Sequence, residues 1–173
     1  MIAKKVFFSG VGIHTGNKVK MSVLPSTPNS GIVFKRTDLK MNNIIYPSVF
    51  NVSSASYCTK ISNEHGVSVS TIEHLMAALY GKGVDNLLIE MDSEEVPILD
   101  GSAMNFVKVI KETGLKHSDI PIKLIKINFA NKLFLLLRDG SIYWPINKTL
   151  ILGDLHLEKS SFLARLGNFL PPY

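Results

Sequence analysis

The sequence predicts an α+β fold: a two-layer domain in which a mostly antiparallel sheet carries two helices on one face. Apolar residues that alternate with polar ones mark half-buried strands, most clearly from Lys18 to Leu24. Two later segments instead repeat their apolar residues at helical spacing. The pattern changes after Asn128, so we expect a domain over 1–127 and a short β-hairpin and β-α fragment over 128–173.

The composition indicates a globular protein and argues against nucleic-acid-binding, disulfide-rich and membrane-spanning classes. The 173 residues are 46% hydrophobic and 19% charged, which is typical of a globular chain. The net charge of +5 is spread without a basic run, so we expect no nucleic-acid partner. A single cysteine, Cys58, excludes an internal disulfide and fits a reducing cytoplasm. No apolar run approaches the roughly 18 residues of a membrane span, and we expect a cytoplasmic protein without a transmembrane segment.

The strands of the first domain follow from alternation and from turn residues between the apolar segments. The segment around Pro47 is a weaker strand, because proline cannot donate to a sheet ladder. We expect strands that begin at Val6 and that cover Lys18–Leu24, Gly31–Arg36, Asn43–Phe50, Tyr57–Ile61, Val67–Val69, Asn86–Met91 and Ile122–Ile127.

The first helix follows Ser70, which we interpret as an N-cap that forms a capping box with Glu73. Glycines end the helix near Gly81. His74 lies off its apolar stripe and next to Glu73. Two interpretations are open: a capping glutamate with a solvated histidine, or a catalytic pair. The stripe consists of Ile72, Leu75, Met76 and Leu79.

The second helix ends at Gly114 and presents a core stripe of Ala103, Phe106, Val107 and Ile110.

A glycine-rich loop from Gly10 to Gly16 follows the first strand and contains His14. Closely spaced glycines indicate a backbone that approaches another group. The loop is either a hairpin with one polar residue or part of a substrate site. We predict His14 and Cys58 as substrate-binding residues.

Residues after 128 form a second pattern. We expect strands over Leu133–Leu137, Ile142–Pro145 and Thr149–Leu152, and a helix over Ser161–Leu166. The last of these strands runs into Asp154 and His156, which are metal-ligating residue types placed at a strand end.

Five motifs of the first domain, in order and at matching spacing, resemble the N-terminal domain of UDP-3-O-acyl-N-acetylglucosamine deacetylases, zinc enzymes of lipid A biosynthesis. The motifs are Gly10–Gly16, Gly31–Arg36, Ser70–Leu75, Gly83–Asn86 and Val96–Ala103. The resemblance implies that His74 is one of three zinc ligands, that Glu73 is the general base, and that the substrate is a UDP-sugar lipid precursor. Zinc with three protein ligands keeps a position open for water.

In that family, the remaining zinc ligands and the acyl channel belong to a second domain. The tail contains no matching His-Lys-x-x-Asp arrangement. We therefore expect one zinc ligand of three, and self-association through the face that the second domain would cover.

The tail instead resembles the N-terminus of a calcineurin-like metallophosphoesterase, from Tyr143 through Asp154 and His156 to Tyr173. This resemblance implies that Asp154 and His156 bind one of two metals, such as manganese. The N-terminal parts of two unrelated enzymes in one chain suggest a gene fusion.

Three hypotheses follow. The chain is a deacetylase whose missing ligands come from another chain, a non-catalytic remnant or binding module, or a metallophosphoesterase fragment.

Overall fold

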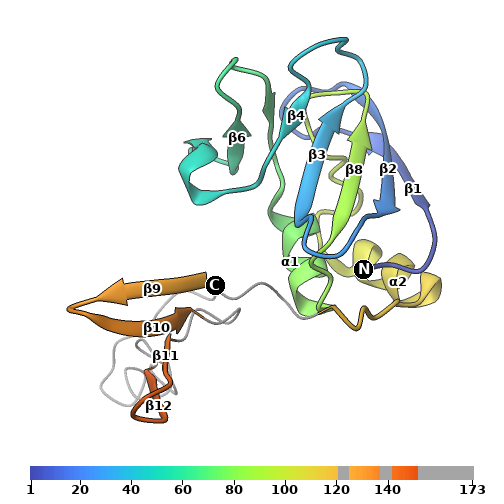
Figure 1. Ribbon diagram of the computed structural model, residues 1–173. Coiled ribbons are helices and arrows are strands. Elements are labelled where there is room, and N and C mark those ends of the chain that lie inside the picture. Colours follow the sequence, from blue (N-terminus) through green and yellow to red (C-terminus); the bar gives the residue numbers. More distant parts are fainter. Residues whose placement is uncertain (121–124, 137–141, 152–173) are drawn as a thin grey trace, which may run out of the picture. The chain divides into compact units, whose positions relative to one another are not determined.

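The computed structural model describes residues 1–120, 125–136 and 142–151, and it divides into two compact units, Met1–Ile122 and Lys123–Tyr173 (Figure 1). We describe each unit by itself. The predicted domain boundary at residue 127 lies inside strand β9 (Ile125–Phe129), which belongs to the second unit.

The first unit is built on a five-stranded sheet with the order β1-β2-β8-β3-β4 (Figure 1). Neighbouring strands are antiparallel except β3 and β8, which run parallel. The sheet is therefore mostly antiparallel, as predicted. Its strands are β1 (Val6–Val11), β2 (Lys18–Pro25), β3 (Ile32–Arg36), β4 (Ile44–Ile45) and β8 (Leu87–Met91).

One face of this sheet forms the core. Burial alternates along β2 and β8, because successive side chains point to opposite faces of a strand. The two helices, α1 (Glu73–Gly81) and α2 (Met104–Thr113), cover the buried face. Phe8 of β1 packs its ring 5.0 Å from that of Phe106 in α2. The core includes Val19, Met21, Val23, Leu87, Ile89, Met91, Leu75, Leu79, Phe106 and Ile110. This confirms the predicted class and most of the helix stripes.

Helix α1 begins later than predicted, and the capping box is wrong. The N-cap is Ile72, and no side chain caps the helix. Thr71 has a φ of 57°, a left-handed conformation that cannot belong to a right-handed helix, so Ser70 is separated from the first turn. Ser70 instead pairs with Glu95 as an isolated parallel bridge, and its hydroxyl donates to the Glu94 carbonyl.

A smaller sheet of three antiparallel strands lies between β4 and α1 in the chain: β5 (Val52–Ser54), β6 (Lys60–Ser62) and β7 (Ser68–Val69). The polar residues 51–56, which suggest a loop by composition, contain β5. The weak strand predicted around Pro47 is divided into β4 and a short 3₁₀ helix (Val49–Asn51). Tyr57, predicted to begin a strand, has a φ of 65° and lies outside β6.

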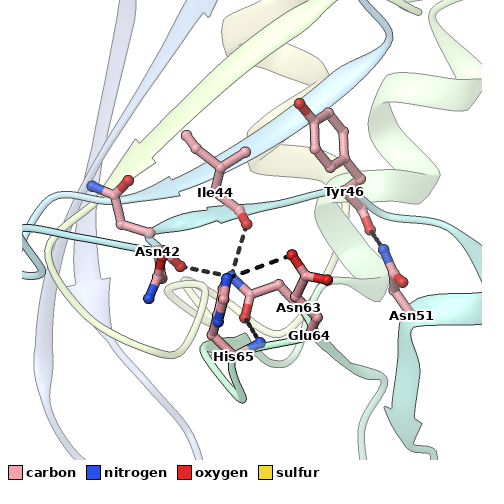
Figure 2. A pocket seen from close by; sticks show the side chains of 8 residues that line it. Asn42, Ile44, Tyr46, Asn51, Asn63, Glu64 and His65 are labelled. Atoms are coloured by element: carbon pink, nitrogen blue, oxygen red, sulfur yellow. Dashed lines mark hydrogen bonds and ion pairs between the residues drawn. The ribbon is translucent and has the colours of Figure 1, made fainter.

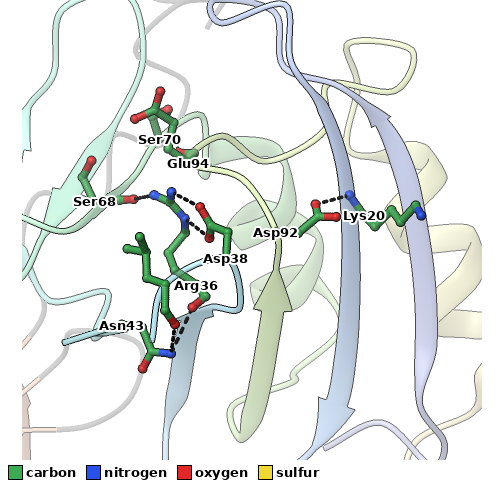
Figure 3. A network of polar contacts seen from close by, with 9 residues as sticks. Lys20, Arg36, Asp38, Asn43, Ser68, Ser70, Asp92 and Glu94 are labelled. Atoms are coloured by element: carbon green, nitrogen blue, oxygen red, sulfur yellow. Dashed lines mark hydrogen bonds and ion pairs between the residues drawn. The ribbon is translucent and has the colours of Figure 1, made fainter. Parts of the chain in front are cut away.

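Arg36 ties the two sheets together (Figure 3). Its guanidinium donates two hydrogen bonds to the Asp38 carboxylate, at 2.8 and 2.6 Å, and one to the Ser68 carbonyl of β7 at 2.9 Å. These hydrogen bonds, with the positive charge beside them, hold the pKa of Asp38 below its ordinary value despite partial burial. The fork of Arg36 therefore fixes β7 against β3.

The second unit contains a four-stranded antiparallel sheet with the order β12-β11-β10-β9. The strand predicted at the end of the first domain is β9, and it pairs with β10 in this unit. The rings of Phe134 and Trp144 lie 5.5 Å apart. The other strands are β10 (Lys132–Leu136), β11 (Ile142–Trp144) and β12 (Thr149–Ile151). The helix predicted over Ser161–Leu166 lies outside the described residues.

Among the residues that the structure describes, no helix is both long and apolar enough to cross a membrane.

Replacing Phe106 with alanine should lower the free energy of unfolding by about 3–5 kcal/mol, because a fully buried ring leaves a cavity. Urea unfolding followed by circular dichroism measures the loss. Met104→Ala, on the exposed side of the same helix, should change it by less than about 0.5 kcal/mol. Equal effects of the two substitutions would contradict the assigned core.

Candidate functional site

Glu73 is the first residue of α1, and the two oxygens of its carboxylate differ in their hydrogen bonding. Oε1 accepts a hydrogen bond from the backbone N–H of Thr59. Oε2 is buried and has no hydrogen-bond partner among the described residues. A buried carboxylate oxygen without a partner is costly, and it marks a position where a water, a proton or a ligand completes the bonding.

His74 follows directly and is half-buried. The apolar residues of α1 face the core on either side of it in sequence, with Ile72 and Leu75 buried. Because adjacent residues diverge by about 100° around a helix, His74 is turned away from that core. The imidazole and the Glu73 carboxylate thus leave the helix at its N-terminal end, where the positive end of the helix dipole favours a negative group.

The segment before β6 faces Glu73. Thr59 is the donor to its carboxylate, and Cys58 is the preceding residue, half-buried. Tyr57 comes next and is 98% exposed in its left-handed conformation. The structure therefore brings Cys58 within one residue of a direct contact to Glu73.

Glu95 joins the glycine-rich loop to the segment that leads into α1. Its side chain is fully buried and accepts from four donors. The backbone N–H groups of His14 and Thr15 donate at 3.1 and 2.8 Å. The hydroxyls of Thr15 and Thr71 donate at 2.8 Å each. One carboxylate thus holds the loop that carries His14 and the residue two positions before Glu73.

The bonding of Glu95 favours its charged form. Burial raises the pKa of this carboxyl, but the hydrogen bonds from the Thr15 and His14 amides and from the Thr71 and Thr15 hydroxyls outweigh it and hold the pKa below the ordinary value. A buried charge that is fully hydrogen-bonded avoids most of the desolvation penalty.

Gly12 is required by the same contact. A Cβ atom at this position would lie 2.2 Å from Glu95 Oε2 and 2.5 Å from Thr15 Oγ1. Both atoms belong to the hydrogen-bonded cluster, so moving them away would break its hydrogen bonds. The glycines of this loop were expected to mark a close approach, and the approaching group is the Glu95 carboxylate.

His14 uses its backbone, not its side chain, in this cluster. The N–H contacts both Glu95 oxygens, at 3.1 and 3.2 Å, while the residue as a whole is exposed. The imidazole therefore projects from a loop whose backbone is fixed.

Metal-ligating residues are not assembled into a complete site in the part of the chain that the structure covers. No group of three or more His, Cys, Asp or Glu side chains there is arranged to hold an ion. The predicted metal pair Asp154 and His156 lies outside the described residues.

A pocket of about 410 Å³ lies elsewhere, between β4 and the β6–β7 turn (Figure 2). Its asparagines already satisfy the backbone: Asn63 Nδ2 donates to the carbonyls of Asn42 and Ile44 at 2.6 and 3.0 Å. Asn51 Nδ2 donates to the Tyr46 carbonyl at 2.9 Å. The pocket contains none of the predicted site residues, and its amides stabilise the turn.

Sequence reasoning missed Glu95 and Thr59. Glu95 lies between the exposed Glu94 and the buried Val96. In the sequence, only the apolar residues that follow it, Val96 and Pro97, indicate that its side chain is buried. Thr59 acts through its backbone N–H, which every residue except proline provides, so no side-chain pattern reveals it.

Comparison with known proteins identifies close relatives of this chain. A family model described as LpxC, UDP-3-O-acyl N-acetylglycosamine deacetylase, matches residues 1–139. A curated UDP-3-O-acyl-N-acetylglucosamine deacetylase from Shewanella baltica is 46% identical over 126 residues, which cover 73% of this chain and 41% of the relative. The protein of the same name from Shewanella oneidensis is 44% identical over the same coverage. The chain thus spans about two fifths of the length of these relatives.

Replacing Glu95 with glutamine should lower the free energy of unfolding by roughly 2–3 kcal/mol near neutral pH, because the donors around it lose a charged acceptor. The folded pKa lies below the unfolded value of about 4.5, so this contribution is complete above that pH and disappears as the pH falls below it. The stability gap between the native chain and Glu95→Gln should therefore shrink on acidification.

Urea unfolding at a series of pH values measures the gap. Glu94→Gln is the matched control, since Glu94 is exposed, and it should change little at any pH. A gap for Glu95→Gln that stays constant down to acid pH would contradict the charged, hydrogen-bonded state.

Proposed function

Because the chain belongs to the UDP-3-O-acyl N-acetylglycosamine deacetylase family, we propose that it supplies the Glu73–His74 part of a deacetylase site. The substrate is UDP-3-O-acyl-N-acetylglucosamine, as the name of the relatives indicates. This compound is a UDP-sugar lipid precursor, and the resemblance places the reaction in lipid A biosynthesis. The observation that carries the proposal is the Glu73 carboxylate, which has one oxygen anchored and one buried oxygen without a partner in the described structure, next to His74.

Glu73 is the general base in this proposal. It takes a proton from water as the water oxygen attacks the carbonyl carbon of the acetamide group. The C–N bond then breaks. Both protons of the attacking water reach the nitrogen, which leaves as an ammonium group, and the acetyl group departs as acetate, so that Glu73 is a free carboxylate again. A carboxylate suits this role because its oxygen lone pairs accept a proton from a water molecule within hydrogen-bond reach.

His74 is proposed as one zinc ligand. The described residues do not form a complete zinc site, so the other ligands must come from outside them. When bound, zinc lowers the pKa of its water to about 7. The chain's own contribution is the orientation of the imidazole at the start of α1, beside the base.

His14 and Cys58 are proposed to contact the substrate. His14 projects from a loop whose backbone Glu95 fixes, and Cys58 precedes the residue that binds Glu73.

We place the reaction in the cytoplasm, where the single thiol stays reduced. That the tail is a metallophosphoesterase fragment, with Asp154 and His156 as metal ligands, stays a prediction.

The proposed base is tested by acetate release from the UDP-sugar substrate. One assay uses the full chain. A second uses a chimera in which residues 1–126 replace the matching part of the Shewanella baltica relative. Glu73→Gln should lower kcat about 10²–10⁴-fold, since proton transfer by a positioned base contributes that much. Glu64→Gln, on the exposed β6–β7 turn, should leave it unchanged. A chimera that folds but releases no acetate would overturn the proposal.

Zinc retention tests the partial ligand set. After dialysis against a metal-free buffer, the full chain should hold clearly less than one zinc per molecule, because a single imidazole binds weakly. The chimera should hold about one, and His74→Ala should remove it. Atomic absorption measures both. One firmly held zinc in the His74→Ala chimera would show that His74 is not a ligand.

A further inference from the structure

We infer that Thr59 is a positioning residue: its backbone N–H holds Oε1 of Glu73, so that Oε2 is the oxygen that receives the proton. This inference rests on the proposed function for its chemistry. The hydrogen bond on which it depends is a feature of the fold and is testable without turnover.

The first step is that the Glu73 side chain does not cap its own helix. The N-terminus of α1 has no side-chain cap, and the carboxylate leaves its own helix to meet the segment before β6. A glutamate in the first turn ordinarily has several rotamers within reach of solvent or of backbone donors. The contact with Thr59 selects one of them.

The second step is that the Thr59 N–H has no competing role. In the β5–β6 pairing, the register joins Val52 to Ile61 and Ser54 to Lys60, so the ladder ends at Lys60. Thr59 lies just beyond it, and its amide is directed to Glu73 instead of to β5. The end of the ladder therefore places an unshared donor opposite the carboxylate.

The third step is that the two carboxylate oxygens differ. An anchored oxygen already accepts a hydrogen bond, whereas Oε2 is buried without a partner in the described structure. A base must present one oxygen within hydrogen-bond reach of the proton that it takes, and a fixed carboxylate orients that oxygen before the substrate binds. Oε2 is the oxygen that meets this requirement.

The backbone around Thr59 supports a fixed geometry. Tyr57 has a φ of 65°, a conformation that a bulky residue rarely adopts and that tertiary structure must maintain. This turn directs the chain into β6 and so sets the direction of the Thr59 amide.

The test measures amide hydrogen exchange of the full chain by NMR. The Thr59 amide should exchange slowly in the native chain and at least about tenfold faster in Glu73→Ala, because its acceptor is removed. Glu64→Ala, on the neighbouring turn, is the control and should leave Thr59 protected. Equal Thr59 exchange in the native chain and Glu73→Ala would overturn the inference, whatever the enzymatic activity.

A kinetic arm separates positioning from general stability. In the chimera, Thr59→Pro removes the backbone donor and also fixes φ, and it should lower kcat about tenfold or more in the acetate assay with KM unchanged. Thr59→Ala, which keeps the N–H, should lower kcat by much less. An unchanged kcat in folded Thr59→Pro would overturn the inference. If the folded chimera releases no acetate, that result counts against the proposed function, and the exchange experiment alone decides the role of Thr59.

Discussion

The buried carboxylate of Glu95 is the interaction on which the arrangement of this site depends. It accepts from the backbone of the glycine-rich loop and from Thr71, which are distant in sequence from each other. Removing a buried ionised acceptor leaves several donors unsatisfied, so the charge of Glu95 stabilises the contact between these segments. The loop that carries His14 and the entry to α1 are therefore parts of one hydrogen-bonded unit.

Much of the fold follows from the sequence. Alternation identified β2, a short apolar run identified β8, and helical spacing identified most of the buried residues of α1 and α2. Burial against one sheet face imposes the periods of β2 and of the helices. The start of α1 did not follow. Ser70 has the residue type of an N-cap, but the left-handed Thr71 and the pairing of Ser70 with Glu95 are tertiary effects that local preference does not contain.

The candidate site divides in the same way. Residue type and spacing alone left Glu73 and His74 open between a capping pair and a catalytic pair, and the family resemblance singled them out. Their roles stay predictions. The groups that contact Glu73 and the segment before it were not recognisable. Thr59 contributes a backbone amide, and Glu95 is one acidic residue of a pair whose other member is exposed. What distinguishes Glu95 from Glu94 is burial, which depends on strands far away in the chain.

The close approach of Gly12 and Glu95 has an evolutionary consequence. A side chain at position 12 is excluded while the Glu95 carboxylate and the Thr15 hydroxyl occupy the adjoining space. Mutations at these positions are therefore contingent on order: the cluster must change before position 12 can accept a side chain, and that intermediate has already lost its hydrogen bonds. A lineage that retains this cluster retains the glycine with it, so the two positions should vary together among descendants, and a non-glycine residue at position 12 should mark a lineage in which the cluster has been lost.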